Sequence, residues 1–257
     1  MKGTQLAAIE PNSHLQPYGV QGYLSIRVLQ RQARMTESSG GKLRFILGFA
    51  AFFAALWFLW DTSIVYPLKI FVVLLHEISH AIASVATGGG IEKITLEPAQ
   101  GGACHCFGGN AFITLTAGYL GSLLWGAAMF SAARSDKVKT NWVNGFIGAM
   151  VMILTIFFVR TGFGVIFGIA FGLTMIVVSK QMGPAVNRGL LLTLGLTSAL
   201  YAILDIKSDV IDRPNIQSDA AMLAEITHVP TMVWGVLWIT IAVAVCTWLM
   251  KRAYEDA

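Results

Sequence analysis

Seven long apolar runs constrain this chain more than any other feature of its sequence. They cover approximately residues 43–60, 67–87, 111–133, 142–159, 163–179, 189–204 and 231–250. Most of them are long enough to cross a hydrocarbon core of ~30 Å as a helix, at about 1.5 Å per residue. The sequence therefore predicts an all-α polytopic membrane protein with six or seven transmembrane helices.

The composition agrees with a membrane location. Apolar residues make up 55% of the chain and charged residues only 12%, whereas soluble domains carry roughly 25% charged residues. The net charge is +4, but most Lys and Arg residues lie between the apolar runs, where they act as flanking anchors. The expected surroundings are therefore the lipid bilayer, and no nucleic-acid partner is expected.

Three segments are predicted: a flexible polar N-terminal tail over residues 1–42, a membrane-embedded domain over 43–250, and a short C-terminal tail over 251–257. No cleavable signal peptide is apparent, because the first apolar run begins only at Leu43. Basic residues precede or open this run and are missing from the loop that follows, so the positive-inside rule predicts a cytoplasmic N-terminus. These basic residues are Arg27, Arg31, Arg34, Lys42 and Arg44.

The fourth and fifth runs are separated only by Arg160-Thr161-Gly162. They form either a tight helical hairpin or a partly re-entrant pair. Gly164, Gly168 and Gly172 recur every four residues and align on one helix face, which predicts close packing against another helix.

The second run carries His76, Glu77 and His80 in a His-Glu-x-x-His pattern. Residues four apart lie about 40° from each other around a helix, so both imidazoles can reach one metal ion. Glu77 lies on the flank of the same face, where it can accept a proton without ligating the metal. Zinc suits these ligands, and the middle of an apolar helix is a costly place for ionisable groups that have no function.

A catalytic zinc ion needs a third protein ligand, and the residues leave several candidates open. No apolar run after residue 87 contains a glutamate. Asp205 directly follows the run that ends at Leu204 and is the preferred candidate. The other candidates are Asp209, Asp212, Asp219, His105 and His228. Asp219 is the second choice, because Ser218-Asp219 can instead cap a helix that begins near Ala220.

Residues 91–96 and 103–107 have the pattern of two short strands joined through Pro98 and Gly101-Gly102, which predicts a β-hairpin in the membrane interface. Its exposed edge can hold a substrate in extended form by strand addition, or the hairpin can be a structured loop without a substrate role. Cys104, His105 and Cys106 form a second, weaker candidate metal cluster.

From Val72 to Trp238 the chain resembles the site-2 protease family of intramembrane zinc metallopeptidases, in its compact branch without large inserted domains. The residues that carry the resemblance are His76-Glu77-Ile78-Ser79-His80-Ala81, Thr87-Gly88-Gly89, Ala117-Gly118-Tyr119-Leu120-Gly121, Leu204-Asp205, Ser218-Asp219-Ala220 and Trp234. The resemblance implies zinc on His76, His80 and an aspartate, with Glu77 as general base. The family's usual aspartate is followed by glycine, whereas Asp205 is followed by Ile206.

The sequence thus favours a zinc metalloendopeptidase that hydrolyses peptide bonds of transmembrane or membrane-associated protein substrates, within or beside the bilayer. Its expected metal ligands are His76, His80 and Asp205. The alternatives are a catalytically inactive metal-binding scaffold and a metal transporter with the same ligands. Glu77 distinguishes them, because neither alternative needs a base that is not a ligand.

Overall fold

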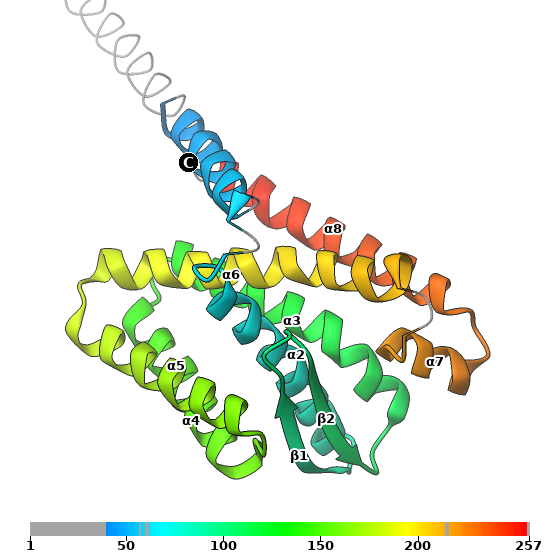
Figure 1. Cartoon of the computed structure of the whole chain (residues 1–257). Helices are drawn as coiled ribbons and strands as arrows, with labels where there is room; N and C mark the ends of the chain where they lie inside the picture. The colour runs from blue at the N-terminus through cyan, green and yellow to red at the C-terminus, as the bar shows by residue number, and fades with distance from the viewer. Residues whose placement is uncertain (1–39, 57, 60–61, 214–215, 256–257) are drawn as a thin grey trace, which may run out of the picture. The chain divides into compact units, whose positions relative to one another are not determined.

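The computed structural model describes residues 40–56, 58–59, 62–213 and 216–255. It divides into two compact units, Met1–Ala51 with Ala257, and Phe52–Asp256. In the first unit the described residues 40–51 are helical. The α-helices and strands of the second unit are labelled in Figure 1. In chain order its elements are α2 (Tyr66–Ala86), β1 (Gly90–Leu96), β2 (Gly102–Phe107), α3 (Ala111–Arg134), α4 (Thr140–Phe158), α5 (Gly162–Gln181), α6 (Pro184–Ile206), the π-helical segment η1 (Lys207–Asp212), α7 (Asp219–Thr227) and α8 (Thr231–Glu255).

Within the described residues, six helical stretches are long and apolar enough to cross a membrane: α2, α3, α4, α5, α6 continued by η1, and α8. The predicted all-α polytopic fold with one β-hairpin is therefore confirmed. The first predicted run, 43–60, overlaps the helical residues 40–56, and its residues 57 and 60 lie outside the described part. The predicted tail over residues 1–42 also lies almost entirely outside it. Helix α8 continues to Glu255, past the predicted boundary at residue 250.

Helix α2 is the most enclosed of the six spans. Of its most apolar stretch, 72% is buried, against 22% for α5 and α8. It begins with a proline in its first turn, where a missing N–H costs no hydrogen bond. It ends at Ala86, and its C-cap Thr87 is followed by Gly88 with a φ of 89°. Because α3, α6 and both strands pack around it, α2 can carry polar side chains that lipid would not accommodate.

Small residues let α3 and α6 approach closely. A Cβ atom on Gly126 of α3 would lie 2.6 Å from the backbone nitrogen of Ala199 and 2.8 Å from the carbonyl oxygen of Gly195 on α6. The Ser198 hydroxyl donates a 2.7 Å hydrogen bond to the Ser122 carbonyl across the same interface. Helix association in lipid relies on such close packing and hydrogen bonding, because apolar burial between helices gains little there.

Helices α4 and α5 form a tight hairpin of two nearly full-length spans, which decides between the two predicted arrangements. The predicted glycine face packs as expected at two positions: a Cβ on Gly168 would overlap Thr155, and one on Gly172 would lie 2.8 Å from the Gly148 carbonyl oxygen, both on α4. Gly164 instead abuts the turn and Leu96 of β1.

The turn between α4 and α5 is attached to strand β1. The backbone N–H of Arg160 donates to the Ile94 carbonyl at 3.0 Å, and the Thr161 hydroxyl donates to the Leu96 carbonyl at 2.9 Å. Val159 also forms a parallel bridge with Ile94. The helical hairpin is therefore fixed to the β-hairpin at this end.

The predicted β-hairpin forms, with one residue added to the start of each strand. Strands β1 and β2 are antiparallel, with Gly90 opposite Phe107 and Leu96 opposite Gly102, and the register shifts between Ile91 and Lys93. Within the described residues β2 pairs only with β1, so its other edge has no strand partner.

The close approach of α3 and α6 is testable with one added methyl group. We expect Gly126→Ala to lower the free energy of unfolding by about 1–3 kcal/mol, because backbone atoms of α6 block the new Cβ. Gly189→Ala is the control: this glycine lies in α6 with nothing within 4 Å of an added Cβ, so alanine should be neutral or slightly stabilising. Thermal unfolding of both variants in detergent compares them. Equal melting temperatures would contradict the packing described here.

Candidate metal centre

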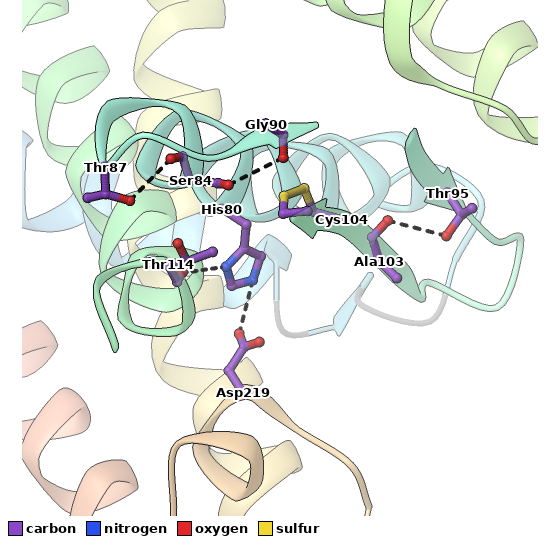
Figure 2. The surroundings of a disulfide bond; sticks show 10 residues. His80, Ser84, Thr87, Gly90, Thr95, Ala103, Cys104, Thr114 and Asp219 are labelled. Atoms are coloured by element: carbon purple, nitrogen blue, oxygen red, sulfur yellow. Dashed lines mark hydrogen bonds and ion pairs between the residues drawn. A yellow bond between two sulfur atoms is a disulfide. The ribbon is translucent and has the colours of Figure 1, made fainter. Parts of the chain in front are cut away.

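His76 and His80 lie one turn apart on α2, and their imidazole rings are close together. The ring centroids are 4.7 Å apart and the ring planes are inclined by 76°. The Nδ1 atom of His80 lies 2.7 Å from the Thr114 carbonyl oxygen. A carbonyl only accepts, so Nδ1 is the donor, and Nε2 of the neutral ring keeps its lone pair. Figure 2 shows the His80 ring between Thr114 and Asp219. His80 is thus held in the tautomer that a metal ligand needs.

The carboxylate of Asp219 faces both imidazoles. Its Oδ2 atom lies 2.9 Å from Nε2 of His76 and 3.1 Å from Nε2 of His80. Ligand atoms of these three residues all lie within 4.8 Å of one another, the only group of this kind in the described part of the chain. Burial alone would raise the pKa of the Asp219 carboxyl, but His80 and His76 beside it outweigh burial and hold that pKa below its usual value. Asp219 is therefore ionised at neutral pH.

Helix α7 brings Asp219 to the site. Ser218 is its N-cap and accepts a hydrogen bond from the Ala221 backbone N–H at 3.2 Å. Ala220 and Leu223 are fully buried in a cluster with Tyr119 of α3 and Trp238 of α8. The capping predicted for this segment is confirmed at Ser218, so the Asp219 side chain is left to point at the histidines.

Asp205, the preferred third ligand on sequence grounds, lies near the site but in a different position. Its Oδ2 atom is 3.9 Å from Nδ1 of His76, the ring nitrogen that faces away from Asp219. It does not belong to the group of converging ligand atoms. The geometry favours Asp219 over Asp205, because the carboxylate of Asp219 lies beside Nε2 of both histidines, whereas Asp205 approaches only Nδ1 of His76.

The remaining aspartates have other partners. The Tyr119 hydroxyl donates to Asp209 at 3.0 Å, and Arg213 donates to the same carboxylate at 2.6 Å. Asp212 accepts hydrogen bonds from Lys207 at 2.6 and 2.7 Å. Neither carboxylate belongs to the converging group, and the same holds for the sequence candidates His105 and His228.

Glu77 is held between α2 and β2. Its side chain is 5% exposed, and its carboxylate accepts a hydrogen bond from the backbone of Cys104. A Cβ atom on Gly102 would lie 2.8 Å from Oε1 of Glu77, so a larger residue at this position would displace the carboxylate. Glu77 is thus oriented beside the converging ligands without belonging to them. No pattern in the sequence predicts this contact between the β-hairpin and Glu77.

The two nearby cysteines are bonded to each other. Cys104 and Cys106 form a disulfide on strand β2, shown in Figure 2. The hypothesis that Cys104, His105 and Cys106 ligate a metal is therefore wrong, because a metal needs free thiolates.

A cavity of about 1770 Å³ opens onto these residues. Its lining includes His76, Glu77, His80 and Asp219 from the site, together with Cys104 of β2. The candidate centre is therefore accessible to a molecule much larger than water.

The fold and the site define a polytopic membrane protein with a His-His-Asp group, of which His80 is buried and the other two are partly buried, and a glutamate beside it. The sequence model described as peptidase M50B-like matches residues 49–249, and the chain belongs to this family of the site-2 protease (M50) group. The resemblance seen in the sequence is confirmed. No curated protein and no solved structure matched the chain.

The fit of the two histidines depends on Gly118 of α3, since a Cβ at this position would overlap Nε2 of both rings. We expect Gly118→Ala to lower metal occupancy at least tenfold while the protein still folds. Elemental analysis of detergent-purified protein measures this, with Gly189→Ala as the glycine-to-alanine control. Full occupancy in Gly118→Ala would contradict convergence of the two rings at this point.

Proposed function

We propose that this protein is a zinc metallopeptidase that cleaves peptide bonds of transmembrane or membrane-associated proteins within or beside the bilayer. His76, His80 and Asp219 are the proposed zinc ligands, and Glu77 is the proposed general base. The observation that carries the proposal is the approach of the Asp219 carboxylate to both Nε2 atoms on the His-Glu-x-x-His helix of an M50B-like peptidase.

The donor set fits zinc. Two imidazole nitrogens and one carboxylate oxygen are the usual protein ligands of a catalytic zinc ion, and donors at its tetrahedral corners lie roughly 3.3 Å apart. The separations of 2.9 and 3.1 Å between Nε2 atoms and Asp219 Oδ2 are close to this value. When bound, the zinc ion supplies a Lewis acid and lowers the pKa of its water to about 7.

Glu77 has the surroundings of a base. Its carboxylate lies outside the ligand group, in the wall of the cavity, and the Cys104 backbone restricts its orientation. In the proposed reaction Glu77 accepts a proton as the attacking oxygen adds to the peptide carbonyl. It then returns a proton to the amine that leaves when the C–N bond breaks. A scaffold or a transporter has no use for such a group.

The cavity and strand β2 support a polypeptide substrate. Gly102, Ala103 and Cys104 of β2 line the cavity beside Glu77, and one edge of this strand has no strand partner among the described residues. A substrate segment in extended form can pair with that edge. A helical span must be unwound locally to do so, and we propose that this happens at the membrane interface.

Replacing the base tests the catalytic role. We expect Glu77→Gln to retain zinc and lose 10²–10⁴-fold in cleavage rate, because the amide keeps the shape but accepts no proton. Purified protein is incubated with a panel of single-span membrane proteins, and zinc is measured on the same samples. Wild-type protein treated with a zinc chelator is the control. A Glu77→Gln rate near that of the wild type would rule out the role, and zinc-loaded wild type without any cleavage would favour the scaffold alternative.

Replacing Asp219 tests the ligand set. We expect Asp219→Ala to empty the zinc site and Asp212→Ala to leave it filled, because Asp212 is about half exposed and paired with Lys207. Zinc content and melting temperature are measured together, so that loss of the ligand is distinguished from loss of the fold. Full zinc content in folded Asp219→Ala would contradict the assignment.

A further inference from the structure

The two ring nitrogens of His76 differ in their contacts within the described structure. Its Nε2 faces Asp219, while its Nδ1 is completely buried and has no hydrogen-bond partner in the described structure. His80 differs, because its Nδ1 has the Thr114 carbonyl at 2.7 Å. The two imidazoles of one centre are thus anchored unequally.

Chemistry determines what Nδ1 of His76 requires. A neutral imidazole that offers the Nε2 lone pair to a metal carries its proton on Nδ1. A buried N–H of this kind needs an acceptor, and ligating histidines almost always have a carboxylate, a carbonyl or a water in that place. The partner must lie on the side of the ring opposite Asp219.

Asp205 lies on that side. Its Oδ2 atom is 3.9 Å from Nδ1 of His76, and its side chain is 22% exposed. An N–H···O hydrogen bond needs about 2.9 Å, so a side-chain movement of about 1 Å closes the gap. Asp209, one turn further on, already accepts from Tyr119 and Arg213.

The Tyr119 ring restricts His76 in another direction. It packs edge-on against the His76 ring, with centroids 4.8 Å apart and planes inclined by 80°. This contact limits the position of the imidazole but offers Nδ1 no acceptor, because the Tyr119 hydroxyl is directed to Asp209. The carboxylate of Asp205 is the group that can complete the anchoring.

We infer that Asp205 is a positioning residue: it accepts the Nδ1–H of His76 and fixes the tautomer and orientation in which His76 binds the metal. This inference rests on the proposed zinc site and gives Asp205 a role different from that of a ligand. The three aspartates then divide the work: Asp219 faces the metal, Asp205 orients His76, and Asp209 holds Tyr119.

The test compares variants that differ only in their acceptor. Zinc affinity of the full-length protein in detergent is measured by competition with a chromophoric chelator. Asp205→Ala should weaken binding 10–100-fold, the usual effect of losing an outer-sphere partner. Asp205→Asn should lose clearly less, because its amide oxygen still accepts the N–H. Asp205→Leu, which keeps the branching of the side chain at Cγ but has no acceptor, replaces the alanine variant if that variant does not fold, and Asp212→Ala is the control.

Cobalt substitution adds a readout that separates positioning from ligation. The visible absorption of the cobalt-loaded protein depends on its direct ligands, so it should keep its shape in Asp205→Asn and change in Asp219→Asn. Unchanged zinc affinity in Asp205→Ala, equal losses in Asp205→Ala and Asp205→Asn, or an altered cobalt spectrum in Asp205→Asn would each overturn the inference. A wild-type protein that binds no zinc would instead overturn the proposed function, so the two failures are distinguishable.

Discussion

The whole site depends on one interaction, the approach of an ionised carboxylate to two imidazoles inside a bundle of apolar helices. An isolated charge in such surroundings costs several kcal/mol. Asp219 meets this constraint because it comes from α7, a nine-residue helix that is not among the candidate spans. Helix α7 places the carboxylate beside histidines that lie in the middle of α2.

Glycines of the neighbouring elements lie where polar side chains of α2 need room. Gly118 leaves room for both imidazoles, Gly102 leaves room for Glu77, and a Cβ on Gly121 would overlap the Ser79 side chain. Each glycine lets a neighbouring backbone approach a polar side chain of α2 without a gap that water would fill. In lipid such close contacts also hold the helices together. These glycines therefore do two things: they leave space for the polar side chains of α2, and they allow the helices to pack closely.

The membrane spans and the β-hairpin depend mainly on residues close together in the chain, so the sequence was sufficient to predict them. The apolar runs predicted the spans, including the run 67–87 for α2, and the strand pattern around Pro98 and Gly101-Gly102 predicted the hairpin. The position of Asp219 is different, because it depends on contacts between α7 and helices that are distant in the sequence. The adjoining apolar run favours Asp205 in the sequence, yet contact with other elements decides burial, and Asp219 is only 14% exposed. The cap at Ser218 was the one local signal for a helix that starts at Asp219.

The β-hairpin connects the turn between α4 and α5 with Glu77 on α2. Strand β1 is fixed on its outer side by the turn between α4 and α5, through Arg160 and Thr161. Strand β2 supplies the Cys104 backbone contact to Glu77, and one of its edges has no strand partner among the residues that the structure describes. A peptide that pairs with this edge would lie beside the strand that contacts Glu77, the proposed base. Because β1 is attached to the helical hairpin, movement of β2 under such pairing is limited, and the distance between the bound peptide and Glu77 is limited with it.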